Sequence, residues 1–273
     1  MTQTSITLAD GTAIPQVGFG TWQVSDADVT PAVLSALEVG YRHIDTAQVY
    51  GNEAGVGRAL ASAGLPRDEV FVTTKLWNDH HHRADARAAL ESSLEKLGLD
   101  HVDLYLIHWP AVPTYGDSYI EAWDALQEFK AEGLTTSIGV SNFHVPHLDA
   151  LSGEVPVINQ VELHPTFAQR PLRNALAERG IAVEAWSPLG SGADLGNAEL
   201  AGIARDLGRS IAQVIIRWHL QHGFVVLPKS VTPARIAENL AVFDFELDAD
   251  AMARLDALDA GNRVGSDPDT ATF

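Results

Sequence analysis

Short runs of apolar, β-forming residues alternate with longer amphipathic stretches along most of the chain. The eight short runs cover residues 17–22, 41–47, 70–76, 102–109, 136–142, 157–163, 181–187 and 224–230. Between most of them, apolar residues recur at the spacing of a helix that buries one face. Alternating strands and helices build βαβ units, in which the strands are parallel. The pattern therefore predicts an α/β fold, a (β/α)₈ TIM barrel formed by a single domain across residues 1–273.

Additional elements are predicted at both ends of this barrel. The segment SITLADGTAIP, residues 5–15, indicates a β-hairpin that turns at Asp10-Gly11 and caps the barrel bottom. Two helical stretches, around 197–207 and 210–221, precede the last strand. Helix 233–243 follows that strand, and an extra C-terminal helix is expected near 248–259. The polar tail 262–273 either covers the mouth of the barrel or is disordered.

Local capping signals agree with the predicted helices. Ser25 with Asp28 predicts a capping box, and Thr232 followed by Pro233 predicts an N-cap and a first helical residue. Glycines stand where helices are expected to end, at Gly40, Gly98, Gly133 and Gly180.

An open, doubly wound sheet is the structural alternative. Such a sheet that binds a dinucleotide normally carries G-x-G-x-x-G at its first strand–helix turn. Here Gly18-Phe19-Gly20 is followed by Thr21-Trp22-Gln23, so the fingerprint is absent and the barrel is favoured.

Four chemically distinctive side chains stand at or just after the ends of three successive predicted strands. Asp45, Lys75 and His108 end the second, third and fourth strands, and Tyr50 follows the second. The C-terminal ends of barrel strands form one rim, and neighbouring strands lie about 4.8 Å apart, so these groups can converge. Each has an ordinary interpretation by itself: a turn acid, a lysine reaching solvent, a core histidine, a helix-opening tyrosine. Four such accidents at one rim are a poor explanation.

The four groups also make chemical sense together. A buried Lys75 needs a partner, which Asp45 supplies. A nearby ammonium favours phenolate, so we expect Lys75 to lower the pKa of Tyr50 from about 10 toward working pH. Such a phenol can protonate a carbonyl oxygen while His108 orients it. The set supplies a proton but no electrons, so carbonyl reduction requires a separate hydride donor.

Composition narrows the choice of ligand and compartment. The formal charge of −18 opposes general binding to nucleic acid or anionic membrane, so an anionic ligand needs a local basic pocket. The absence of cysteine excludes disulfides, thiol nucleophiles and thiolate metal sites. No apolar run reaches the roughly 18 residues of a membrane helix, and the N-terminus lacks a signal-peptide pattern, so we expect a cytoplasmic protein.

The segment GYRHIDTAQVYGNE, residues 40–53, resembles the G-x-R-x-x-D-T-A-x-x-Y-x-N-E motif of the aldo-keto reductase family. The resemblance extends from GFGTW to KSVTPARIAEN and is greatest to the bacterial 2,5-diketo-D-gluconate reductase branch. It implies NADPH-dependent reduction of a small carbonyl substrate by a monomer. It also implies a catalytic tetrad of Asp45, Tyr50, Lys75 and His108, in which Tyr50 is the general acid.

The same resemblance implies where NADPH or NADP⁺ binds. Ser141, Asn142 and Gln160 would hold the carboxamide, and Trp186, often tyrosine in the family, would stack on the nicotinamide. KSVTPAR would grip the 2′-phosphate at a helix start. The full cofactor set is Thr21, Ser141, Asn142, Gln160, Trp186, Ser187, Leu189, Ser191, Lys229, Ser230, Val231, Arg235, Glu238 and Asn239. The substrate set is Trp22, Tyr50, Trp77, His108 and Trp109.

Other functional classes explain the sequence less well. Asp79-His80-His81-His82 invites a metal site, but consecutive loop histidines without cysteine favour no metal. No G-x-S-x-G elbow of a serine hydrolase is present. A non-catalytic NADPH-binding module is the remaining alternative, and it gives no reason for a tuned phenol opposite a histidine.

Overall fold

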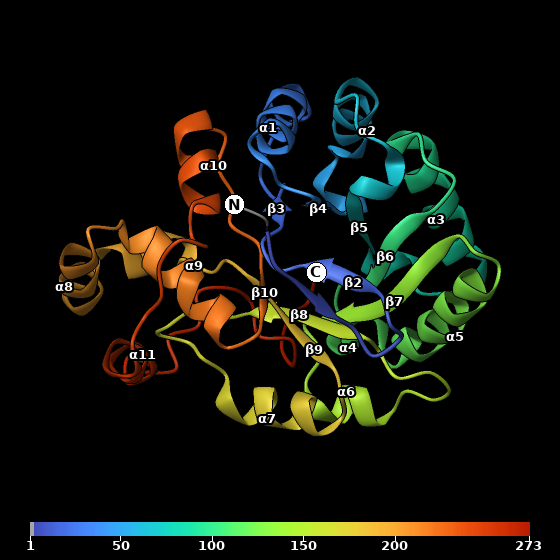
Figure 1. Ribbon diagram of the computed structural model, residues 1–273. Helices are drawn as coiled ribbons and strands as arrows, with labels where there is room; N and C mark the ends of the chain where they lie inside the picture. The colour runs from blue at the N-terminus through green and yellow to red at the C-terminus, as the bar shows by residue number, and fades with distance from the viewer. Residues whose placement is uncertain (1–2) are drawn as a thin grey trace.

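A ring of eight parallel strands forms the centre of the computed structural model, which describes residues 3–273 (Figure 1). Neighbouring strands follow chain order around the ring. The ring closes where the first strand meets the last, since Gly18 N donates to Val226 O and Val226 N donates to Gln16 O. The predicted barrel is therefore confirmed. Its strands are β3 (Phe19–Gly20), β4 (His43–Asp45), β5 (Phe71–Leu76), β6 (Val102–Ile107), β7 (Thr135–Ser141), β8 (Ile158–Glu162), β9 (Ala182–Trp186) and β10 (Val225–Val226).

Helices surround the strands and cover their outer faces (Figure 1). The helices before β9 are α1 (Asp26–Val39), α2 (Glu53–Ser62), α3 (Arg83–Leu97), α4 (Val112–Tyr115), α5 (Ser118–Ala131), α6 (Val145–Asp149) and α7 (Arg170–Glu178). Those after it are α8 (Ala198–Leu207), α9 (Ile211–Gln221), α10 (Pro233–Leu240) and the predicted extra helix α11 (Ala249–Asp256). Short 3₁₀ turns are η1 (Gln48–Tyr50), η2 (Arg67–Glu69), η3 (Asn78–His80) and η4 (Gly190–Gly196).

Most predicted strands and some predicted helices are longer than the observed ones, and the last strand and the helix after it are two examples. The pattern predicts the last strand over 224–230, but only Val225–Val226 pair as a strand, because Pro228 has no N–H to donate to a neighbour. The helix expected over 233–243 ends at Leu240, since Ala241 has left the helical conformation (ψ 63°). Both differences shorten the elements without changing their order.

The capping signals are confirmed in part. The Ser25 hydroxyl accepts from Asp28 N, but the Asp28 carboxylate accepts from that hydroxyl and not from the Ser25 backbone, so the reciprocal half of the box is absent. Thr232 and Pro233 occupy the predicted positions, although the Thr232 side chain makes no capping bond. The predicted glycines all have left-handed φ: Gly40, Gly98, Gly133 and Gly180.

Side-chain alternation on β6 shows how the barrel separates two apolar layers. Tyr105 and Ile107 point outward and pack with the surrounding helices. Leu104 and Leu106 point inward, where they join residues of the hairpin formed by β1 (Ser5–Thr7) and β2 (Ala13–Pro15). The hairpin thus closes the N-terminal end of the barrel, and polar groups gather at the other end.

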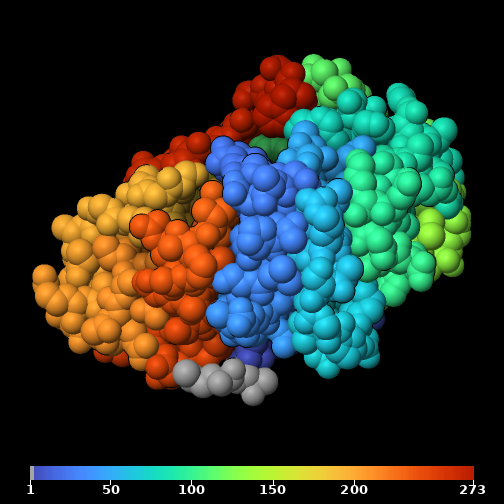
Figure 2. Space-filling view, turned by 90° about the horizontal axis from the view of Figure 1, so that it is seen from above, coloured from blue at the N-terminus to red at the C-terminus, as the bar shows by residue number. Residues whose placement is uncertain are grey.

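The C-terminal tail lies at the end of the barrel opposite the hairpin, where its red atoms cap the top of Figure 2. Across residues 3–273, no helix has the length and apolar character needed to cross a membrane.

Candidate active site

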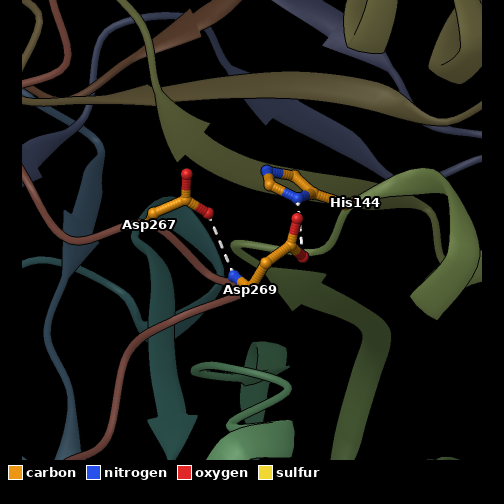
Figure 3. A group of neighbouring side chains, drawn as sticks. All are labelled: His144, Asp267 and Asp269. Carbon is orange, nitrogen blue, oxygen red and sulfur yellow. Dashed lines mark hydrogen bonds and ion pairs between the residues drawn. The ribbon is translucent and has the colours of Figure 1, made fainter.

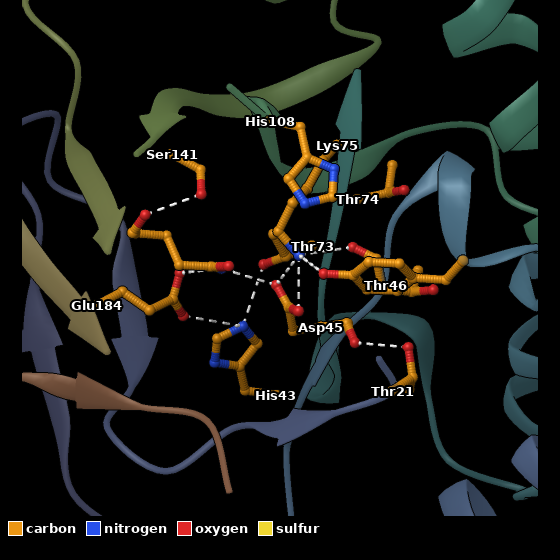
Figure 4. Close-up of polar contacts among 12 residues, drawn as sticks. Thr21, His43, Asp45, Thr46, Thr73, Thr74, Lys75, His108, Ser141 and Glu184 are labelled. Atoms are coloured by element: carbon orange, nitrogen blue, oxygen red, sulfur yellow. Dashed lines mark hydrogen bonds and ion pairs between the residues drawn. The ribbon is translucent and has the colours of Figure 1, made fainter. Parts of the chain in front are cut away.

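Lys75 is the centre of the polar cluster at the C-terminal end of the barrel (Figure 4). Its ammonium lies 2.7 Å from both carboxylate oxygens of Asp45 and 2.9 Å from the carbonyl of Thr46. It also lies 3.4 Å from the hydroxyl of Tyr50, which η1 carries just past β4. Lys75 has no exposed surface, so this pairing offsets a large desolvation cost.

His108 completes the group that the sequence predicted. Its ring packs edge-on against Tyr50, with centroids 5.6 Å apart. Burial and the nearby Lys75 hold the pKa of His108 well below its usual range, so the imidazole is neutral. Nδ1 is buried with no partner among the described residues. A proton there would be an unpaired donor, which favours the tautomer protonated on Nε2.

The expected pKa shift of Tyr50 is wrong in direction. Burial raises its pKa to about 12, and the opposing effect of Lys75 is the smaller one; Asp45 adds to the rise. The sequence located the two partners correctly but could not weigh the loss of water around the phenol against one ammonium. Tyr50 is therefore protonated at neutral pH, which is the form that a proton donor needs.

Polar residues on β7 and β8 continue the cluster toward Trp186. The amide nitrogen of Asn142 donates to the backbone carbonyl of His108, and Trp186 Nε1 donates to the Asn142 side-chain oxygen at 2.8 Å. Ser141 Oγ donates to the backbone carbonyl of Gln160. The Gln160 side chain donates to Asp45 at 2.9 Å. The residues predicted around a nicotinamide thus form one hydrogen-bonded group with the tetrad.

Among residues 3–273, three of the six non-glycine residues with positive φ belong to this predicted cofactor group. Asn142, Ser187 and Ser191 have φ values of 64°, 47° and 52°, in the left-handed region that non-glycine residues rarely adopt. Such conformations cost of order 1–3 kcal/mol each and cluster at ligand sites. Ser187 lies directly after β9, Leu189 lies directly before η4, and Ser191 is part of η4.

The predicted phosphate residues lie apart from the tetrad, at the start of α10. Lys229 and Arg235 are exposed, and neither pairs with a carboxylate within residues 3–273. Ser230 accepts from Thr232 N, and Val231 is 53% exposed. The other predicted members are placed on α10 and beside β4: Glu238, buried Asn239, and buried Thr21, whose hydroxyl donates to the carbonyl of Asp45.

An aromatic group surrounds the tetrad at the mouth of the barrel. Trp77 lies edge-on to His108 and stacks with Phe273, whose ring also meets Trp109 edge-on at 5.1 Å. The predicted tail therefore covers part of the mouth. Trp22 does not join this group: it is 47% exposed and stacks with no aromatic ring of the described chain. The sequence contained no periodic signal that would single out Phe273.

A hydrogen bond between His144 and Asp269 helps to hold the tail in place (Figure 3). His144 Nδ1 lies 2.9 Å from Asp269, whose backbone N–H donates to Asp267. His144, Asp267 and Asp269 bring ligand-type atoms within 4.8 Å of one another, but Asp269 is largely exposed and the His144–Asp269 pair accounts for the arrangement. We interpret the group as a tether of the tail.

A second tether is buried beneath the tail and the η4 turn. His164 lies 3.2 Å from both Glu162 and Asp194, and the ring and both carboxylates are buried. Although burial opposes it, the two carboxylates raise the pKa of His164 to about 9. Glu162 also accepts from the backbone N–H groups of Val264 and Gly265. One imidazolium thus connects β8, the η4 turn and the tail.

The three consecutive histidines of the 79–82 segment do not converge. His80 pairs with Asp79, His81 with Ser118, and His82 with Glu121. Each ring therefore has its own local partner.

Comparison with known proteins agrees with this geometry. Residues 16–260 match the aldo/keto reductase family. The chain belongs to the aldo/keto reductase family. It is 52% identical to methylglyoxal reductase DkgA of Escherichia coli strain K12, over 97% of each chain. The crystal structure of Gox0644 in its apo form is 45% identical, covers 100% of both chains and superimposes with a TM-score of 0.96. A Gox0644 mutant in complex with NADPH gives the same identity, coverage and TM-score.

The resemblance drawn from the sequence is thereby confirmed. As an aldo/keto reductase, the protein is an NADP(H)-dependent oxidoreductase, and the family activity is carbonyl reduction. The hydride donor that the four polar groups themselves lack is therefore NADPH.

Proposed function

We propose that this aldo/keto reductase reduces small aldehydes and ketones with NADPH, and that Tyr50 donates the proton. The observation that carries the proposal is the position of Lys75, held by both oxygens of Asp45 and within 3.4 Å of the Tyr50 hydroxyl. No structural role requires an ammonium to be buried beside a phenol and a neutral imidazole.

The residues present fit NADPH at both of its ends. Lys229 and Arg235 are exposed cations without carboxylate partners within the described residues, in a chain of net charge −18, which suits the 2′-phosphate. Ser141, Asn142 and Gln160 would hold the carboxamide, and Trp186 would lie against the ring. The rest of the proposed set covers the pyrophosphate, ribose and adenine: Thr21, Ser187, Leu189, Ser191, Ser230, Val231, Glu238 and Asn239.

When bound, the cofactor supplies a hydride. The protein's part is to deliver and steer one proton. Tyr50 stays protonated because burial raises its pKa to about 12, and it releases the proton only when a carbonyl oxygen gains alkoxide character. Lys75 then stabilises the phenolate, while Asp45 keeps the ammonium in place. The neutral His108 donates a hydrogen bond from Nε2 and so orients the carbonyl.

Small, compact carbonyl compounds are the best-supported substrates. Trp77, Trp109 and Phe273 lie together beside His108, and aromatic walls of this kind suit small carbonyl ligands. The similarity to methylglyoxal reductase supports methylglyoxal as the first compound to test, with 2,5-diketo-D-gluconate beside it.

The deciding experiment measures NADPH oxidation with these two compounds, in the wild type and in Tyr50→Phe. We expect the wild type to turn over at least one of them. Phenylalanine keeps the ring and removes the proton, so kcat is expected to fall by about 10²–10⁴-fold. Because NADPH binding does not use the phenol proton, its Kd is expected to stay within about threefold. Undiminished turnover, or loss of NADPH binding by a folded variant, would contradict the assigned role.

A further inference from the structure

Glu184 is a carboxyl group buried in the barrel that the proposed reaction does not use. It lies on β9, two residues before Trp186, so both side chains point to the inner face. Its exposure is 0%, and Figure 4 shows it pointing toward the tetrad. Oε2 accepts a 2.8 Å hydrogen bond from Gln160, and Oε1 lies 3.8 Å from Nε2 of His43.

The charges of the interior leave Glu184 without a cation. Lys75 places its ammonium against Asp45 and makes no ion pair with Glu184. His43 is neutral, because burial lowers its pKa to about 3. Among the groups that face Glu184, β4 supplies His43 and Asp45, β5 supplies Lys75 and η1 supplies Tyr50, whereas β10 is Val225–Val226 and supplies none. One buried ammonium can neutralise only one of the two carboxylates.

The physical resolution is that Glu184 keeps its proton. Burial, and after it the charge of Asp45, raise the pKa of Glu184 to about 8. Oε2 accepts from Gln160, so the proton belongs on Oε1, which has no other partner among the described residues and faces the neutral ring of His43. In this form Glu184 adds no net charge beside the Lys75–Asp45 pair.

The amide of Gln160 lies between the two acids. Its nitrogen donates to Asp45 Oδ2 at 2.9 Å and to Glu184 Oε2 at 2.8 Å, which uses both amide hydrogens. Reversing the amide would place its oxygen against the carboxylate oxygen of Asp45, two acceptors without a hydrogen between them, and would remove one of the hydrogen bonds to Asp45. The side-chain oxygen of Gln160, Oε1, receives no hydrogen bond from residues 3–273, in contrast to its backbone carbonyl, which accepts from Ser141. Oε1 is therefore free to accept from an N–H donor.

We propose that Glu184, held uncharged, is the positioning residue that fixes the amide of Gln160 with its NH₂ group toward the two acids. This orientation reserves the Gln160 carbonyl as a hydrogen-bond acceptor for the carboxamide N–H of the nicotinamide. The inference rests on the proposed cofactor site, and Glu184 acts only through Gln160. No pattern along the chain indicates this role, since a single glutamate in a short strand has no spacing signal.

The variants Glu184→Gln and Glu184→Leu distinguish the effect of the hydrogen bond to Gln160 from the effect of the volume of the side chain. Glutamine copies the protonated acid, because its oxygen accepts from Gln160 and its NH₂ faces His43. Leucine fills similar space and leaves one Gln160 hydrogen unpaired. Exposed Glu95→Gln is the matched surface control.

The first readout is the side-chain ¹⁵NH₂ signal of Gln160 in the intact protein, assigned by its loss in Gln160→Met. We expect it to shift with a midpoint near pH 8 in the wild type, since Glu184 ionises there, and to stay constant in Glu184→Gln. In Glu184→Leu its exchange with water should rise at least about tenfold. A signal that does not titrate between pH 6 and 10 in the wild type overturns the uncharged state.

The second readout is NADPH affinity from tryptophan quenching. Glu184→Gln and Glu95→Gln should stay within about threefold of the wild type, and Glu184→Leu should weaken Kd by about tenfold or more. Unchanged affinity in a folded Glu184→Leu overturns the positioning role while the proposed function stands. If the wild type binds no NADPH, the proposed function is contradicted instead. The pH titration of the Gln160 NH₂ signal then still determines the protonation state of Glu184. Should leucine prevent folding, the wild-type titration and Glu184→Gln remain decisive.

Discussion

The two ends of the proposed cofactor site are built on opposite principles. At the tetrad, Asp45 and Lys75 are buried, paired and held by several hydrogen bonds. At the start of α10, Lys229 and Arg235 are exposed and have no carboxylate partner within the described residues. At the tetrad, the charges of Lys75 and Asp45 are therefore paired within the protein. At the start of α10, the cations remain available for an anionic ligand.

This difference separates stability from binding. A buried ion pair is costly to break, because one charge is left without water or partner. Exposed cations contribute little to folding, but they attract an anion in an acidic protein whose remaining surface repels it. Substitutions at the tetrad are expected to change both folding and turnover, and those at α10 to change binding alone.

Lys75→Met tests the buried end and should give the largest effect. It leaves Asp45 buried without its cation, so the free energy of unfolding should fall by about 3–5 kcal/mol, measured by urea unfolding. The exposed Lys229→Met is the matched control, with a change within about 0.5 kcal/mol. The double variant Asp45→Asn with Lys75→Met should recover part of the loss. A loss below about 1 kcal/mol for Lys75→Met would break the comparison.

The η4 turn, which His164 ties to β8, should show an intermediate effect of pH. The pKa of His164 is about 9 in the folded protein, above its ordinary 6.5, so its stabilisation is complete below pH 6.5 and lost as pH rises through 9. We expect the stability difference between wild type and His164→Asn to shrink by about 2 kcal/mol across that window. Taking the difference cancels the titration of Glu184. A difference independent of pH would mean that His164 is not charged.

Arg235→Ala tests the exposed end. Loss of one charge-assisted contact to the 2′-phosphate should raise the Kd of NADPH about tenfold and leave NADH within about twofold. Stability should not change measurably. Arg205→Ala, another exposed arginine without a carboxylate partner in the described chain, is the control. Equal weakening of both cofactors would place the 2′-phosphate elsewhere.

Phe273→Ala should give the smallest effect, on the substrate alone. Loss of the ring that stacks on Trp77 should raise KM for methylglyoxal by about threefold to fivefold. NADPH affinity should not change. Val155→Ala, at an exposed position that is not part of the proposed site, provides the control. A raised NADPH Kd would show that the tail serves the cofactor.

Much of this architecture was predictable from local patterns. The order of strands and helices followed from alternation and glycine stops, and the tetrad from four polar residues at strand ends. Properties that depend on the combined effect of many neighbours in the folded structure were not predictable. The pKa of Tyr50 depends on how much water the fold removes from around the phenol. The protonation of Glu184 depends on the fact that the one nearby ammonium, Lys75, is paired with Asp45. Phe273 reaches the mouth only because the tail is tethered through distant residues.

The two ends of the barrel also differ in how well they would tolerate attachment to a tag or a solid surface. The ring of Phe273 lies against Trp77 and Trp109, and its carbonyl accepts from Asn78. A bulky group attached to the tail beside Phe273 would therefore lie at the mouth of the barrel and compete with substrate. The hairpin of residues 5–15 lies at the far end. Immobilisation through a surface residue of this hairpin therefore leaves the mouth of the barrel facing the solution.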